Sequence, residues 1–115
     1  MAGKIKVIIK RPDEKYGHVT HISNTLENFQ RTVGGPIETL VIAQDTLLIV
    51  NEEGKLREDF IPNFKIWSDI PALGFPVHDV IYGTAVVVGI DGEEFTDVPI
   101  GFDFWQELLL DWGNY

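Results

Sequence analysis

Two runs of apolar, β-branched residues, one near each end of the chain, constrain its fold most. Residues 4–10 alternate Lys with apolar residues and then become continuously apolar, and residues 80–90 contain three consecutive valines. β-Branched side chains favour extended backbone, so each run predicts a strand. Gly83 interrupts the second run, where we expect a bulge or a close backbone approach.

Shorter segments between and after these runs also predict strands, separated by turn residues that make neighbouring strands antiparallel. They are the hairpin partner of the first strand at 18–22, a pair at 37–42 and 46–50, and an edge strand at 93–98 after the Asp-Gly turn at 91–92. Gly54 is expected to supply a positive φ to the turn before it. For residues 56–76 we expect an extended segment held to the core by its aromatic side chains.

A helix is predicted over residues 25–33, with Gly34 and Pro36 ending it. Asn24 is the favoured N-cap because Glu27 follows at the spacing of a capping box, and Thr25 is the alternative. A second helix is predicted over 101–112, with an apolar stripe of Phe102, Trp105, Leu109 and Trp112. Together these elements predict one α+β domain spanning residues 1–115, in which two helices pack on a mainly antiparallel sheet.

Charge is distributed unevenly along the chain, whose formal net charge is −9. Residues 1–65 hold all nine Lys and Arg and nine Asp and Glu, whereas residues 66–115 hold nine Asp and Glu and no Lys or Arg. The second half is therefore a poor nucleic-acid surface, because phosphate contacts need cationic side chains. It suits a cationic partner, or serves only as a solvated acidic surface.

The start of the chain lacks the apolar core of a signal peptide, and no window has the 18 or so apolar residues that a membrane span needs. There is no cysteine, so disulfides and thiolate metal sites are excluded. We expect a cytoplasmic protein without a membrane segment.

Three stretches taken in order resemble a known protein family: the predicted helix and its Gly-Gly turn at 25–38, the strand and Asn-Glu-Glu-Gly turn at 48–56, and the apolar run at 79–89. The family is domain of unknown function 3846. The resemblance implies an intracellular accessory protein of phage or plasmid origin, and it supplies no catalytic residues. Residues from Phe102 onward depart from the family pattern.

The sequence contains no recognisable catalytic motif. Ser23 and Ser68 are the only serines, and neither lies in a Gly-x-Ser-x-Gly turn. His18 and His21 point to opposite faces of an extended segment, and the acidic residues at 91–97 lack the spacing of a calcium loop. We therefore predict a protein that is not an enzyme, with no catalytic residue, metal or cofactor. A small hydrolase with paired carboxylates stays open as an alternative.

Two groups of residues are the candidate binding sites. Lys4, Lys6 and Lys10 share strand parity, so with Arg11 and Arg31 they could bind a small anionic ligand; the alternative is that lysines protect an edge strand. The side chains of Phe102, Trp105 and Trp112 could dock a partner protein or a second subunit, and the alternative is packing on the domain's own sheet.

The leading functional prediction is a binding protein of mobile-element type that acts in counter-defence and sequesters a nucleotide-like ligand. The alternative is an inhibitor that blocks a host protein through the acidic C-terminal half, as a nucleic-acid mimic. Binding to nucleic acid itself is not expected, and homo-oligomerisation is left open.

Overall fold

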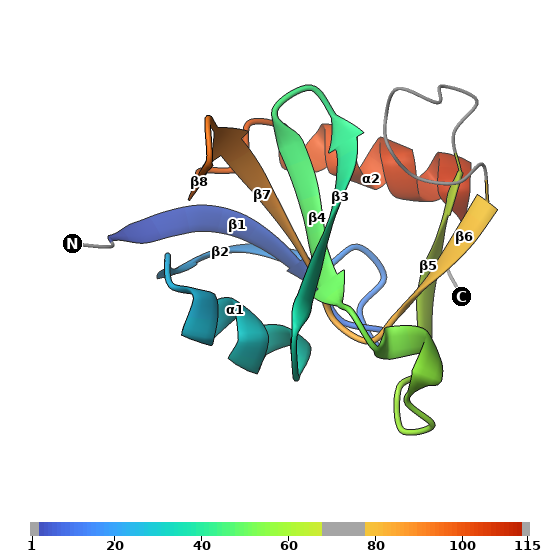
Figure 1. Ribbon diagram of the computed structural model, residues 1–115. Helices are drawn as coiled ribbons and strands as arrows, with labels where there is room; N and C mark the ends of the chain where they lie inside the picture. Colours follow the sequence, from blue (N-terminus) through green and yellow to red (C-terminus); the bar gives the residue numbers. More distant parts are fainter. Residues whose placement is uncertain (1–2, 68–77, 114–115) are drawn as a thin grey trace.

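The computed structural model describes residues 3–67 and 78–113. Within these ranges, six strands form one antiparallel sheet in the order β2-β1-β7-β4-β3, with β8 paired to β7 (Figure 1). The strands are β1 (Lys4–Lys10), β2 (His18–Ser23), β3 (Ile37–Ala43), β4 (Thr46–Asn51), β7 (Ala85–Asp91) and β8 (Glu94–Thr96).

A second, two-stranded sheet consists of β5 (Pro62–Trp67) and β6 (His78–Tyr82), also antiparallel. The helices of the described residues are α1 (Leu26–Val33), α2 (Phe102–Trp112) and the short 3₁₀ helix η1 (Gly54–Leu56). The prediction of an α+β fold, with a mainly antiparallel sheet and two helices, is confirmed.

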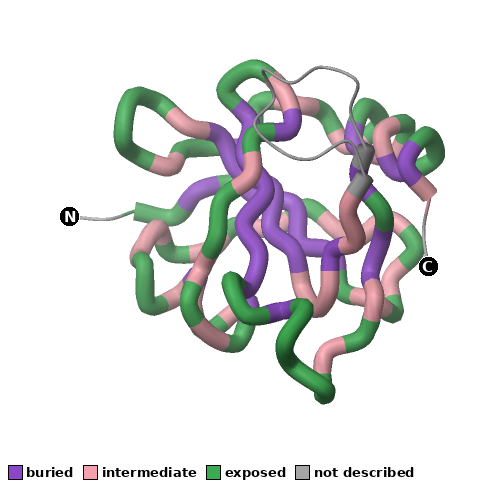
Figure 2. The backbone as a smooth tube through the Cα atoms, turned by 45° about the vertical axis from the view of Figure 1, so that its right-hand side comes forward, coloured by how far each residue is buried: buried purple, intermediate pink, exposed green. Residues whose placement is uncertain are grey.

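The six-stranded sheet lies between two layers, and strand alternation divides its apolar side chains between them. Val7, Ile49 and Val88 pack with Phe29 of α1 on one face. On the other face, the adjacent residues of the same strands pack against α2 and the β5–β6 sheet. Figure 2 shows that buried residues concentrate in the central strands, which are apolar on both faces and therefore read as unbroken apolar runs.

Three aromatic side chains join α2 to the second sheet. Trp105 meets Phe64 edge-on at 5.6 Å between ring centroids, and Trp112 stacks on Phe64 at 6.2 Å. The indole of Trp105 is fully buried and donates a hydrogen bond to the Tyr16 carbonyl oxygen at 2.8 Å. Such ring pairs stabilise beyond their apolar burial, and the polar edge of a buried Trp needs this kind of acceptor.

The aromatic stripe of the C-terminal helix therefore belongs to the core. Trp105 is 0% and Trp112 is 8% exposed, and Phe102 packs partly buried against the same cluster. The prediction that these three side chains dock a partner is wrong for the folded chain, because they already cover the chain's own sheet. The helix itself is confirmed.

The second apolar run is not one strand. It divides at Gly83, so that β6 belongs to the small sheet and β7 to the large one. Gly83 has a φ of +77°, and a Cβ there would lie 3.0 Å from the ring of Phe60. The expected close approach is confirmed, and the left-handed backbone at this glycine redirects the chain between the sheets.

Three local expectations need correction. Thr25, not Asn24, caps α1, accepting a hydrogen bond from the Asn28 N–H at 3.2 Å, while the Asn24 side chain donates to the Phe95 carbonyl oxygen. Gly54 begins η1 without a positive φ, so the turn before it is not of the expected type. The returning strand β8 has three residues rather than six, because the chain after it leaves β7 and Val98 N–H bonds to the Lys6 carbonyl oxygen.

Other local expectations hold. Gly34 ends α1 with a φ of 85°, and the β1–β2 and β3–β4 hairpins form as expected. The segment expected to be extended over 56–76 is only partly so: residues 62–67 form β5, Leu56 ends η1 and residues 57–61 form no strand. Residues 68–76 lie outside the described residues.

Gly83→Ala should destabilise the fold more than Gly92→Ala. Both glycines have a left-handed φ, +77° and +64°, but a Cβ at Gly92 meets no atom within 4 Å. We expect a loss of about 1 kcal/mol in the free energy of unfolding for Gly92→Ala, and at least about 2 kcal/mol for Gly83→Ala, measured by urea denaturation. Equal losses would show that the contact with Phe60 contributes nothing.

Candidate functional site

The five residues predicted to bind an anion do not form one site. Lys4 and Lys6 are exposed on β1, on the face opposite to α1, whereas Arg31 is an exposed residue of α1 itself. Arg11 pairs with Glu14 at 3.5 Å. Moreover, β1 lies between β2 and β7, so the alternative interpretation of its lysines as protection for an edge strand is also wrong.

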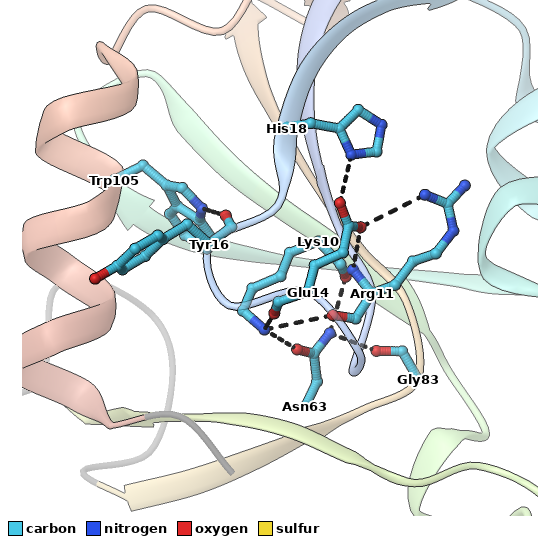
Figure 3. Close-up of polar contacts among 8 residues, drawn as sticks. All are labelled: Lys10, Arg11, Glu14, Tyr16, His18, Asn63, Gly83 and Trp105. Carbon is cyan, nitrogen blue, oxygen red and sulfur yellow. Dashed lines mark hydrogen bonds and ion pairs between the residues drawn. The ribbon is translucent and has the colours of Figure 1, made fainter.

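Lys10 is an internal side chain, only 1% exposed. Its ammonium Nζ donates to Asn63 Oδ1 at 2.6 Å, to the Glu14 carbonyl oxygen at 2.7 Å and to the Arg11 carbonyl oxygen at 3.4 Å (Figure 3). Desolvation lowers the pKa of Lys10, against the smaller opposing effect of the Glu14 and Asp13 charges. Since its three donors are used internally, Lys10 is not available to the predicted ligand.

The carboxylate of Glu14 organises the loop around this lysine. Its Oε1 accepts the Arg11 backbone N–H at 3.0 Å, and its Oε2 lies 2.7 Å from His18 Nδ1. Desolvation alone would raise the pKa of Glu14, but the hydrogen bonds and the positive charges of His18 and Arg11 together outweigh it and hold the pKa below 4.5. The loop thus closes the β1–β2 hairpin while presenting its carbonyl oxygens to Lys10.

A cavity lies elsewhere, beside the second sheet and the end of α2. It is an open groove of about 700 Å³. Its lining comes from η1, β5, β6 and α2, namely Lys55, Lys65, Ile66, Asp79, Val80, Tyr82, Asp111 and Trp112. We call it the groove. Its volume is in the range of small-molecule sites.

A smaller cavity of about 110 Å³ extends the groove toward the large sheet. The two cavities share Lys55, Asp79, Val80 and Tyr82, and the smaller one also touches β3 and β4. The groove therefore arises where the second sheet stands away from the first.

Charged side chains and an apolar floor face each other in the groove. Lys55 forms an ion pair with Asp79, and Asp79 Oδ1 also accepts the Val80 N–H at 2.8 Å. The Lys55 side chain is 59% exposed, so its ammonium can also contact a ligand. The Tyr82 hydroxyl makes no hydrogen bond with any described residue. The half-buried Val80 and the exposed edge of Trp112 supply apolar surface, while Ile66 is fully buried. The groove can thus hold a ligand with an anionic group, hydroxyl or amino groups and an apolar part.

Sequence reasoning missed this site. Lys55 and Asp79 are 24 residues apart and belong to no motif. The described residues contain no group of three His, Asp or Glu side chains placed to hold a metal ion. Neither α1, η1 nor α2, the helices that the structure describes, is long and apolar enough to cross a membrane.

Comparison with known families matches residues 5–108 to the family described as Domain of unknown function (DUF3846). The chain belongs to this family. The match runs from β1 into α2 and so covers residues 102–108, part of the stretch from Phe102 onward that is expected to depart from the family pattern. No curated protein and no solved structure matches the chain.

Glu14→Gln should reduce the loss of stability in acid. Because the pKa of Glu14 is below 4.5 in the folded chain, its charged form stabilises the fold above pH 4.5, and this contribution is lost as the pH falls through the folded pKa. The free energy of unfolding should therefore fall less between pH 6 and pH 3 in the variant than in the wild type. Glu93→Gln, at an exposed turn, is the control and should keep the wild-type slope. An unchanged slope in Glu14→Gln would contradict the assignment.

Proposed function

We propose that the chain is a non-enzymatic binding protein that holds a nucleotide-like small molecule in the groove. The observation that carries this proposal is the meeting of lysine side chains, carboxylates and a tyrosine hydroxyl that bonds to no described residue around a cavity of about 700 Å³. Few polar groups converging over apolar surface are typical of small-molecule sites.

The composition of the groove fits the parts of a nucleotide. Lys55 offers a cation to a phosphate, and the carboxylate of Asp79 can accept a hydrogen bond from a ribose hydroxyl or a base amino group. The half-buried Tyr82 offers its ring and its hydroxyl to a base. A ligand that carries both an anionic group and hydrogen-bond donors can contact Lys55 and Asp79 at once, whereas a simple anion can contact only the lysine.

A setting inside the cell, in a phage or plasmid, with a role against a host defence, is part of the proposal. Its support is the family resemblance described above, together with a groove suited to removing a small signal molecule from solution. Sequestration requires tight binding without turnover, so a bound ligand has to replace or share the Lys55–Asp79 ion pair.

Thermal unfolding with a panel of mononucleotides, cyclic nucleotides and cyclic dinucleotides tests this function. A ligand at 100 times its Kd stabilises the folded chain by about 2.7 kcal/mol, which raises the Tm by roughly 10 °C for a domain of this size. Lys55→Met and Tyr82→Phe should each reduce the shift, measured against the variant's own ligand-free Tm.

Lys4→Met is the matched control for this experiment. It removes the same charge from an exposed position on β1, outside the groove, and should leave the ligand-induced shift unchanged. A panel without any response would contradict the proposed function. A response abolished by Lys4→Met and kept by Lys55→Met would place the ligand on β1 instead.

The outer face of α2 favours one second candidate, an inhibitor of a basic host protein. Phe104 and Leu110 are 46% and 65% exposed, and the acidic residues Asp103 and Glu107 are exposed beside them. Opposite charge speeds association and exposed apolar side chains provide anchors. Capture of a basic protein that is lost at high salt and in Phe104→Ser would support it; the nucleotide experiment is independent of this outcome.

A further inference from the structure

The smaller cavity of about 110 Å³ lies between the two sheets, next to the groove. Strands β3 and β4 form one of its walls, and β6 forms another. Glu38 of β3 pairs with Val50 of β4, whose side chain packs in the core on the α2 side of the large sheet. Because cross-strand partners share a face, the Glu38 side chain lies on this same side, at the wall of the cavity.

Two carboxylates of this cavity are free to accept hydrogen bonds. Glu38 and Glu52 both line it and are both exposed. Neither carboxylate bonds to any other described residue. A carboxylate accepts hydrogen bonds and donates none, so these side chains favour a ligand group that carries N–H or O–H donors.

Fewer hydrogen-bond donors are left in the cavity. The Asn51 amide is already used, because its Nδ2 donates to the Val33 carbonyl oxygen and its Oδ1 accepts the Glu53 N–H. The Tyr82 hydroxyl bonds to no other described residue and can donate to a ligand. The cavity thus offers two free carboxylates and one free hydroxyl.

Charge and size decide which end of a nucleotide can enter the smaller cavity. Three carboxylates and one ammonium group line it, whereas two of each line the groove. The excess of carboxylates repels a phosphate, which therefore stays in the groove, near Lys55. The volume of about 110 Å³ is also below the range of pockets that hold a whole small molecule, so that only the base enters.

We propose that the smaller cavity binds a guanine base and that the Glu38 carboxylate is the group that recognises it. This inference rests on the proposed function, since it assigns the base of the nucleotide-like ligand. Guanine presents two neighbouring donors on one edge, the ring N1–H and the exocyclic 2-amino group. The two oxygens of one carboxylate match these two donors, as they match two N–H groups of an arginine.

Other bases fit these acceptors less well. Adenine presents its amino group beside the unprotonated ring nitrogen N1, an acceptor that would face the carboxylate without a hydrogen bond. In guanine the remaining group of the same edge is the 6-carbonyl oxygen, which the Tyr82 hydroxyl can bond. The cavity therefore selects guanine both by the bonds it forms and by the acceptors it repels.

Titration calorimetry of the full chain with GMP, IMP and AMP tests this inference. IMP is the matched ligand, because it differs from GMP only in lacking the 2-amino group. We expect GMP to bind at least about tenfold more tightly than IMP, since a hydrogen bond to a charged acceptor is lost in IMP. AMP should also bind at least about tenfold more weakly than GMP, since it leaves an acceptor facing the carboxylate.

Glu38→Gln is the variant that tests the recognising group. It keeps the size of the side chain but replaces one acceptor oxygen by an amino group, so it should remove most of the preference for GMP over IMP. Glu93→Gln is the matched control, because it makes the same change at an exposed turn outside both cavities. It should keep the wild-type preference.

The outcomes separate this inference from the proposed function. Equal affinities for GMP and IMP would overturn the guanine assignment and would leave nucleotide binding in the groove standing. A preference for GMP that persists in Glu38→Gln, or that Glu93→Gln removes, would overturn the role of Glu38. If GMP, IMP and AMP all fail to bind, the guanine assignment is overturned, and the wider nucleotide panel decides on the proposed function.

Discussion

The ammonium group of Lys10 lies inside the protein and is held by the side chain of Asn63, 53 positions later in the sequence. Asn63 is also buried, and its Nδ2 donates to the carbonyl oxygens of Lys10 and Gly83, both at 2.8 Å. These hydrogen bonds between Lys10, Asn63 and Gly83 join the end of β1, the start of β5 and the glycine between β6 and β7. The second sheet is thus fixed to the first by polar groups that water cannot reach.

A buried ammonium without a carboxylate in contact is costly, and its persistence needs every donor to be bonded. Here amide and carbonyl oxygens supply the acceptors, and no buried side-chain polar atom of the described residues is left without a partner. Such a network is sensitive to position, since a shift of either sheet would leave a charge unbonded. The aromatic contacts of Phe64 with α2 add apolar stabilisation next to it. Together they set the offset between the sheets that produces the groove.

Much of the fold could be predicted from the sequence because its signals are local. The β-branched runs, the Gly34 helix end and the periodic stripe of α2 each depend on neighbouring residues. The division of residues 78–91 into two strands at Gly83 could not be predicted in this way. A continuous apolar sequence looks the same whether it forms one strand or two strands in different sheets. The choice of Thr25 over Asn24 likewise depends on a distant contact, the Phe95 carbonyl that bonds Asn24.

The candidate site was beyond sequence reasoning for the same reason. Lys10 has the parity of Lys4 and Lys6, and nothing near it shows that Asn63 will cover it. The residues of the groove come from four elements and meet only because the sheets are offset. The sequence places the excess negative charge in the C-terminal half, and α2 exposes part of it. Charge alone does not show which apolar side chains of this helix are exposed to solvent.

A double-mutant cycle on Lys10 and Asn63 tests most directly whether this pair joins the two sheets. Lys10→Met, Asn63→Leu and the double variant are compared with the wild type by their free energies of unfolding in urea. Each single change leaves buried polar groups without partners, so we predict a coupling energy of about 2 kcal/mol, with the double variant losing less than the sum of the single losses. Losses that add to within about 0.5 kcal/mol would contradict the account.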